Sequence, residues 1–151
     1  MEELLFDILT ASVEETEAVG ETLARRIAEE DTMPRFVALY GDLGVGKTAF
    51  VRGFARVLAP ESAVRSPTLS IVNEYRARPL SVFHFDLYRI EDEDDLYSVG
   101  YDDYLLRPGV CIAEWCEKIP YALPRERIAV TIEKNDPSNV DSRHVQVSLL
   151  G

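Results

Sequence analysis

Cysteine is scarce in this sequence, with only Cys111 and Cys116 among 151 residues. Two cysteines and two histidines are too few for the disulfide framework of a small secreted domain, and they lack the ligand spacing of a zinc site. No apolar stretch approaches the roughly 18 residues of a membrane-spanning helix. The acidic residues 1–3 lack the basic flank of a signal peptide. We therefore expect a cytoplasmic protein that does not work at a membrane.

Positive charge is also in short supply. The chain has 16 lysines and arginines against 27 aspartates and glutamates, which gives a net charge of −11. A protein that binds nucleic acid unaided usually carries a basic surface, and this chain as a whole does not. If the protein works near RNA, we expect another protein to supply the basic surface. A local phosphate site is still compatible with this charge, because salt screens each exposed charge beyond roughly 8 Å.

The pattern of apolar residues predicts strands that alternate with helices. We expect strands at residues 4–9, 36–40, 69–76, 80–85, 110–114, 127–134 and 144–149. We expect helices at residues 12–30 and 47–58, and one or two short helices within 91–106 that break near Gly100. Ser12 and Glu15 fit a capping box at the start of the first helix. The order predicts a single α/β domain over residues 1–151, with a mixed parallel and antiparallel sheet flanked by helices.

Glycine is concentrated in one turn between a predicted strand and a predicted helix. Its residues fit the P-loop pattern Gly41-x-x-x-x-Gly46-Lys47-Thr48. Such glycines let main-chain N–H groups turn inward around phosphates, at the positive end of the helix dipole. We expect the phosphates of a nucleotide to be bound by Gly41, Asp42, Leu43, Gly44, Val45, Gly46, Lys47 and Thr48. The fold is therefore expected to be P-loop NTPase-like, and the alternative is a glycine-rich turn without a ligand.

Two side chains of the P-loop have distinct expected roles. Lys47 supplies a mobile cation for the β- and γ-phosphates, and Thr48 offers its hydroxyl to the Mg²⁺ that bridges them. GTPases usually add an Asn-Lys-x-Asp motif and an Asp-x-x-Gly switch, and neither pattern occurs in this sequence. ATP is therefore the favoured nucleotide.

Carboxylates follow two of the predicted strands. Asp86 and Glu114 each end an apolar run, and ligands collect at the carboxyl ends of parallel strands. Both are candidates for a Mg-nucleotide site, and exposed strand-end acids are the alternative. Ser66-Pro67-Thr68 is the third candidate segment, because Thr68 could present its hydroxyl to the γ-phosphate or Mg²⁺. The alternative there is an ordinary Ser-Pro turn.

The motifs GDLGVGKT, SPT, HFDLYR and EW occur in this order along nearly the whole chain. In this combination the sequence resembles the TsaE (YjeE) family of bacterial ATPases. The set His84-x-Asp86-x-Tyr88-Arg89 with Glu114-Trp115 is far more specific than a P-loop alone. Val45 stands where the family usually has alanine, and Leu69 where an aromatic residue is common.

The resemblance implies a function in tRNA modification. Members of the family bind ATP with Mg²⁺ and hydrolyse it slowly alone. They act on a threonylcarbamoyl-transfer complex whose subunits are of the TsaB and TsaD types. The product is threonylcarbamoyladenosine, next to the anticodon of tRNAs that read codons starting with A. The protein is expected to meet tRNA only indirectly, through these partners.

The resemblance also implies roles for single residues. Thr48 and Glu114 are the expected metal contacts. Asp86, Thr68 and Lys47 form the expected catalytic set, in which Asp86 holds a metal-bound or attacking water and Thr68 senses the γ-phosphate. Trp115 is expected to pack near the nucleotide, with a core tryptophan as the alternative.

Two other functions remain open from the sequence. A small-molecule kinase would share the P-loop and add a lid with arginines, for which residues 125–127 are the only candidate. A nucleotide-dependent binding module would hydrolyse ATP only incidentally. For His84 a hydrogen-bonded structural role is favoured over acid–base catalysis. For residues 91–95 a solvated helix start is favoured over a docking surface.

Overall fold

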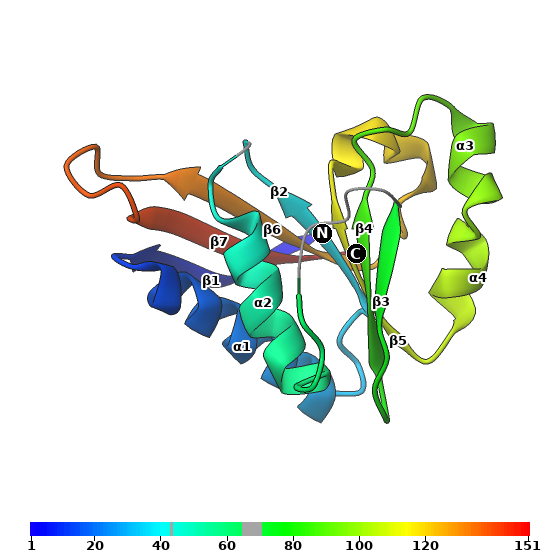
Figure 1. Ribbon diagram of the computed structural model, residues 1–151, viewed down its shortest axis with the longest axis horizontal. Helices are drawn as coiled ribbons and strands as arrows, with labels where there is room; N and C mark the ends of the chain where they lie inside the picture. The colour runs from blue at the N-terminus through cyan, green and yellow to red at the C-terminus, as the bar shows by residue number, and fades with distance from the viewer. Residues whose placement is uncertain (43, 65–70) are drawn as a thin grey trace.

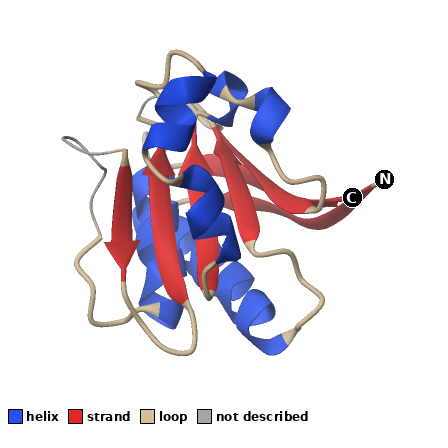
Figure 2. Cartoon of the chain, turned by 90° about the vertical axis from the view of Figure 1, so that its right-hand side faces the viewer, coloured by secondary structure: helices blue, strands red, loops and turns tan. Residues whose placement is uncertain are grey.

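The computed structural model describes residues 1–42, 44–64 and 71–151, which form one seven-stranded sheet with helices on both faces (Figures 1 and 2). The strands are β1 (Glu2–Thr10), β2 (Phe36–Tyr40), β3 (Val72–Tyr75), β4 (Ser81–Asp86), β5 (Gly109–Glu114), β6 (Arg127–Lys134) and β7 (Arg143–Leu150). The helices are α1 (Val13–Glu29), α2 (Lys47–Leu58), α3 (Glu93–Ser98) and α4 (Tyr101–Leu106), with 3₁₀ turns η1 (Cys116–Lys118) and η2 (Pro120–Ala122).

The strand order is β1-β7-β6-β2-β5-β4-β3. The four central strands β6, β2, β5 and β4 run parallel, while β7, β1 and β3 are antiparallel to their neighbours. The expected mixed sheet is thereby confirmed. The carboxyl ends of β2, β5 and β4 lie at the same edge, where Asp86 and Glu114 are register partners.

The central strands are apolar throughout because both of their faces are covered. Along β2, Val37 and Leu39 contribute to the core beneath α1 and α2. Phe36 and Ala38, which alternate with them, contribute to a second core beneath α3 and α4. This alternation follows from the two-residue period of a strand, so one short strand separates two apolar layers.

Helix α1 begins with the cap that the sequence predicts. The Ser12 hydroxyl accepts the Glu15 N–H at 3.1 Å. The Glu15 carboxylate accepts the main-chain N–H of Ala11 at 2.9 Å. A capping box would use the N–H of the next residue, Ser12. One orphan donor of the first turn, the Glu15 N–H, and the N–H of the residue before the cap are thus satisfied by the same pair of side chains.

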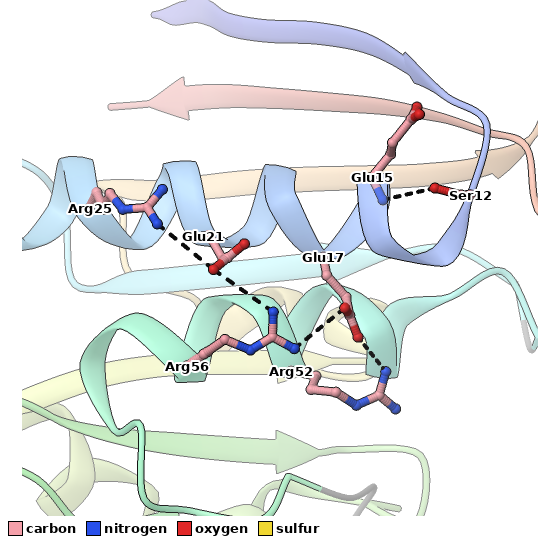
Figure 3. A network of polar contacts seen from close by, with 7 residues as sticks. All are labelled: Ser12, Glu15, Glu17, Glu21, Arg25, Arg52 and Arg56. Atoms are coloured by element: carbon pink, nitrogen blue, oxygen red, sulfur yellow. Dashed lines mark hydrogen bonds and ion pairs between the residues drawn. The ribbon is translucent and has the colours of Figure 1, made fainter.

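Helices α1 and α2 pack backbone to backbone at two glycines. A Cβ on Gly53 would lie 1.9 Å from the main-chain oxygen of Glu17, and one on Gly20 would lie 2.3 Å from that of Phe50. Above this contact the Glu17 carboxylate pairs with Arg52 at 2.8 Å and with Arg56 at 3.4 Å (Figure 3). The close contact fixes α2, and with it the turn that precedes α2.

The remaining differences from the sequence lie between the central elements. Strand β3 begins at Val72, and residues 65–70, which include the first two of the predicted strand, fall outside the described ranges. Turns η1 and η2 were not predicted, because segments of three residues carry no usable period. Helix α3 starts within the acidic run 91–95, at Glu93 with Asp92 as the cap, which confirms the expected helix start.

The chain ends meet at one side of the sheet. The Met1 ammonium donates to the main-chain oxygen of Gly151, and β1 pairs with β7 along its length (Figure 2). Among the described helices, none is both long and apolar enough to cross a bilayer.

Candidate functional site

The glycine-rich turn connects β2 to α2 at the carboxyl edge of the parallel strands. Gly44 and Gly46 adopt φ angles of 79° and 98°, in the left-handed region that side chains with a Cβ rarely enter. Gly46 is also the N-cap of α2, and no side chain caps that end. The first turn of α2 therefore presents main-chain N–H groups beside the loop, as an anion site requires. Leu43 lies outside the described residues.

Lys47 is the first residue of α2 and is buried against the end of β5. Its Nζ lies 3.8 Å from Oε1 of Glu114, and both side chains are more than nine-tenths buried. A buried charge is costly unless an opposite charge or a hydrogen bond compensates it. The pair thus places a compensated cation and anion next to the loop. Thr48 follows in the same turn of α2 and is half-buried.

The second oxygen of Glu114 is fixed from β4. Its Oε2 lies 2.6 Å from Nε2 of His84, whose Nδ1 lies 3.2 Å from the hydroxyl of Tyr75. His84 is fully buried, and both of its ring nitrogens are hydrogen-bonded. This arrangement is that of a structural histidine, as favoured from the sequence. It orients the Glu114 carboxylate so that one oxygen faces Lys47.

Asp86 lies beside Glu114, at the end of the neighbouring strand. Burial raises the pKa of the Asp86 carboxyl above its usual value, and the negative charge of Glu114 raises it further. The Tyr88 N–H donates to Oδ1 of Asp86 at 3.1 Å, which opposes this rise. Asp86 and Glu114 thus form a negatively charged edge of the sheet that faces the loop. Of the two carboxylates, that of Glu114 is held by Lys47 and His84.

Trp115 directly follows Glu114 and adopts a φ angle of 63°. A bulky residue rarely adopts this conformation, which costs of order 1–3 kcal/mol. In this backbone conformation the indole lies beside Lys47, whose ammonium is 4.6 Å from the centroid of the ring. The Tyr88 ring also packs against the indole, with the two ring centroids 5.1 Å apart. Trp115 is only partly buried, so it borders both the second core and the Lys47 side of the loop.

The structure thus brings together Gly41, Asp42, Gly44, Val45, Gly46, Lys47, Thr48, Asp86, Glu114 and Trp115 at one edge of the sheet. Thr68 of the predicted catalytic set lies outside the described residues, and its expected role stays a prediction.

Sequence reasoning missed Arg143, which is buried behind the loop. Its guanidinium donates to the main-chain oxygens of Val45 and Gly44, from Nε at 2.5 Å and from Nη2 at 3.3 Å. Arg143 is opposite Lys134 in the β6–β7 register. That register places it at the same edge as the loop and is the signal that could have revealed it.

A cavity of about 700 Å³ borders the loop, and Lys47 is not among the residues that line it. It is lined by Gly41, Asp42, Val45, Glu117 and residues 131–134. Its charged residues are three acids and one lysine, so it repels a phosphate group. The Lys47 side of the loop is the electrostatically favoured position for a polyphosphate.

The comparisons with known proteins agree with this geometry. The family model described as threonylcarbamoyl adenosine biosynthesis protein TsaE matches residues 10–145. The tRNA threonylcarbamoyladenosine biosynthesis protein TsaE of Bacillus subtilis is 37% identical over 142 residues, which are 94% of this chain and 84% of the relative. The protein of the same name from Haemophilus influenzae is 34% identical over 145 residues, and the match covers 84% of this chain and 89% of the relative.

The fold agrees as well. The crystal structure of YdiB from Bacillus subtilis is similar with a TM-score of 0.76 and 31% sequence identity, and the match covers 100% of this chain and 88% of that protein. The likeness confirms the α/β fold with its mixed sheet, and the sequence matches extend over the glycine-rich turn and the strand-end carboxylates. This chain belongs to the TsaE family of threonylcarbamoyl adenosine biosynthesis proteins.

Proposed function

We propose that this protein binds ATP with Mg²⁺ at the turn formed by residues 41–48 and hydrolyses it to ADP and phosphate. The hydrolysis would support the threonylcarbamoyladenosine modification of tRNA. The observation that carries the proposal is the buried Lys47, which faces Glu114 at 3.8 Å beside a left-handed glycine turn. A site that only stabilised the fold would gain little from such a pair, because desolvation offsets much of the attraction between buried charges.

The phosphates would be bound by main-chain N–H groups of the loop and by Lys47. Gly44 has open space where a Cβ would stand, with no atom of the described residues within 4 Å apart from its chain neighbours, so a ligand can approach the main chain there. Lys47 would exchange its contacts with Glu114 and the Trp115 ring for the β- and γ-phosphates. Trp115 would then lie next to the bound nucleotide.

The residues present fit a magnesium ion. The Thr48 hydroxyl and the Glu114 carboxylate are hard oxygen ligands of the kind that Mg²⁺ prefers. Within the described parts of the chain, no group of three or more His, Cys, Asp or Glu side chains could hold a metal alone. Phosphate oxygens and water would therefore complete the coordination, as is usual for a Mg-nucleotide site. When bound, the ion neutralises charge on the phosphates.

Hydrolysis would depend on the second carboxylate. Asp86 would accept a hydrogen bond from the attacking water at the γ-phosphorus, and Thr68 would sense the γ-phosphate. The raised pKa of Asp86 makes it a better proton acceptor than an ordinary aspartate once it is ionised. The P–O bond to ADP would break as the bond to the water oxygen forms, and Asp86 would take up the water proton and later release it to solvent.

The partners would be the TsaD-type and TsaB-type subunits of the threonylcarbamoyl-transfer complex. The modified adenosine lies next to the anticodon in tRNAs that read codons starting with A. With a net charge of −11, the chain is suited to meet tRNA only through these subunits, in the cytoplasm. The transfer reaction itself would take place on the partner complex.

The proposal is tested against a kinase by measuring ADP release with and without a panel of hydroxyl acceptors. We expect slow release that no acceptor accelerates, and acceptor-dependent turnover would favour a kinase instead. The candidate lid arginine Arg127 lies at the start of β6 and donates to the main-chain oxygen of Pro124 at 3.0 Å. This contact holds Arg127 at the start of β6, which argues against a role in a mobile lid over the nucleotide.

A nucleotide-dependent binding module is separated by the variant Asp86→Asn. We expect the variant to lose both ATP hydrolysis and support of tRNA modification in a reconstituted assay. Lost hydrolysis with intact modification would favour the module.

A further inference from the structure

Arg143 is a buried cation whose described hydrogen bonds all go to main-chain oxygens. It is the first residue of β7 and is 9% exposed. In addition to the two P-loop oxygens, its Nη1 donates to the main-chain oxygens of Val140 and Ser142, both at 2.7 Å. One guanidinium thus links the β6–β7 connection to the turn between β2 and α2.

No carboxylate among the described residues forms an ion pair with Arg143. A buried guanidinium that is not paired with an acid is expensive, and carbonyl dipoles compensate it only partly. Its charge therefore produces a positive electrostatic potential in the low-dielectric region behind the loop. Lys47 differs in this respect, because Glu114 faces it.

The planar trans peptide explains how a contact on one side of the loop acts on the other. The C=O and N–H of one peptide unit point in opposite directions. Holding the Val45 oxygen toward Arg143 directs the N–H of Gly46, on the same peptide unit, away from Arg143. Nη2 holds the Gly44 oxygen, while the N–H of the same peptide unit, on Val45, donates to the Asp42 oxygen within the turn at 3.4 Å.

We propose that Arg143 is a positioning residue for phosphate binding. It fixes the Gly44 and Val45 peptide units so that the Gly46 amide faces the phosphates, and it adds positive potential through the loop. The proposal rests on the proposed binding of ATP at residues 41–48. Arg143 would act on the nucleotide through the loop main chain, whose oxygens it holds, without touching the nucleotide itself.

The geometry demands arginine rather than positive charge alone. Nε and Nη2 reach two successive carbonyls of the loop while Nη1 reaches two carbonyls of the hairpin. A lysine ammonium is a point charge and cannot span both pairs. Arg143→Lys thus separates the contribution of the fork from that of the charge.

The test compares Arg143→Met and Arg143→Lys with the control Arg127→Met. Arg127 is also tied to main-chain oxygens, those of Pro124 and Arg125. It lies at the far end of β6, opposite Leu150, and touches no oxygen of the loop. Titration calorimetry gives the Kd for Mg-ATP, steady-state kinetics give KM and kcat, and thermal melting reports the fold.

We expect Arg143→Met to raise Kd and KM for Mg-ATP at least about tenfold, with a smaller change in kcat. Arg143→Lys should fall between this variant and the natural protein, and Arg127→Met should leave Kd unchanged. If Arg143→Met does not fold, Arg143→Lys carries the test with an expected rise of several fold.

Unchanged Kd in a folded Arg143 variant, with only a lower melting temperature, would show a purely structural role and overturn the inference alone. Absence of Mg-ATP binding in the natural protein would overturn the proposed function as well.

Discussion

Lys47 and Glu114 form a buried pair between helix α2 and strand β5, with Nζ 3.8 Å from Oε1. The pair joins the start of α2 to the end of β5, so it connects the glycine turn to the strand-end carboxylates. Both groups would gain new partners when Mg-ATP binds: phosphate for the lysine and the metal for the glutamate. The contact keeps both charges compensated until then, so nucleotide binding exchanges one set of ionic contacts for another.

Removing the loop cation should weaken nucleotide binding. Lys47→Ala loses a charge-assisted contact to phosphate worth about 1.5–3 kcal/mol, so Kd for Mg-ATP should rise about 10- to 100-fold. Titration calorimetry measures this change. Arg56→Ala is the matched control, because it removes a cation from the exposed face of the same helix. Equal affinity in Lys47→Ala and the natural protein would contradict the assigned site.

Neutralising the carboxylate on β5 should affect turnover more than binding. Glu114→Gln keeps the shape of the side chain beside His84 and removes its charge. We expect kcat to fall at least about 30-fold, with less than about a tenfold change in Kd for ATP. Phosphate release followed over a magnesium titration checks both points. An unaltered Mg²⁺ dependence would mean that Glu114 is not the metal contact.

The helix contact behind the loop should not tolerate a methyl group. Alanine gains about 1 kcal/mol over glycine in a helix, but the Cβ of Gly53→Ala would lie 1.9 Å from the Glu17 oxygen. We expect a net loss of at least about 2 kcal/mol in the free energy of unfolding, measured in urea. Gly151→Ala is the control, since the nearest atom to its Cβ is 3.7 Å away. A Gly53→Ala variant as stable as the natural protein would refute the close packing.

Acid should remove a surface contribution to stability. Hydrogen bonding to Arg107 lowers the pKa of the Glu74 carboxyl from its ordinary 4.5 to about 2. A carboxyl with a lowered pKa stabilises the fold above its unfolded pKa, and this stability is lost as the pH falls from about 4.5 to about 2.

Glu74→Gln should therefore cost about 0.5–1 kcal/mol at pH 7, and the cost should shrink as the pH falls from about 4.5 through about 2. Urea unfolding over this pH range checks the difference, with Glu14→Gln on the exposed side of α1 as the control. A difference that stays constant with pH would exclude the ion pair as its source.

Local pattern was sufficient to predict most elements and half of the site. The short apolar strand, the glycine turn and the helix that follows are encoded within residues 36–58, so their order and type could be predicted. Asp86 and Glu114 end their strands, and the rule that parallel strands share a carboxyl edge was enough to bring them together.

The remaining features depend on contacts between distant residues. Arg143 reaches Val45 across 98 positions of the chain, and only the β6–β7 register reveals that it lies behind the loop. The left-handed backbone of Trp115 opposes its own local preference and is sustained by packing against Tyr88 and Lys47. Both features arise from tertiary structure, which a single sequence does not display.

The most direct test of the central claim is a pull-down of the TsaD-type and TsaB-type subunits with this protein, performed with Mg-ATP, with Mg-ADP and without nucleotide. We expect the amount of complex retained to differ between the ATP and ADP samples, and Lys47→Ala to abolish that difference. Equal retention in all three samples, or no retention in any of them, would contradict the account.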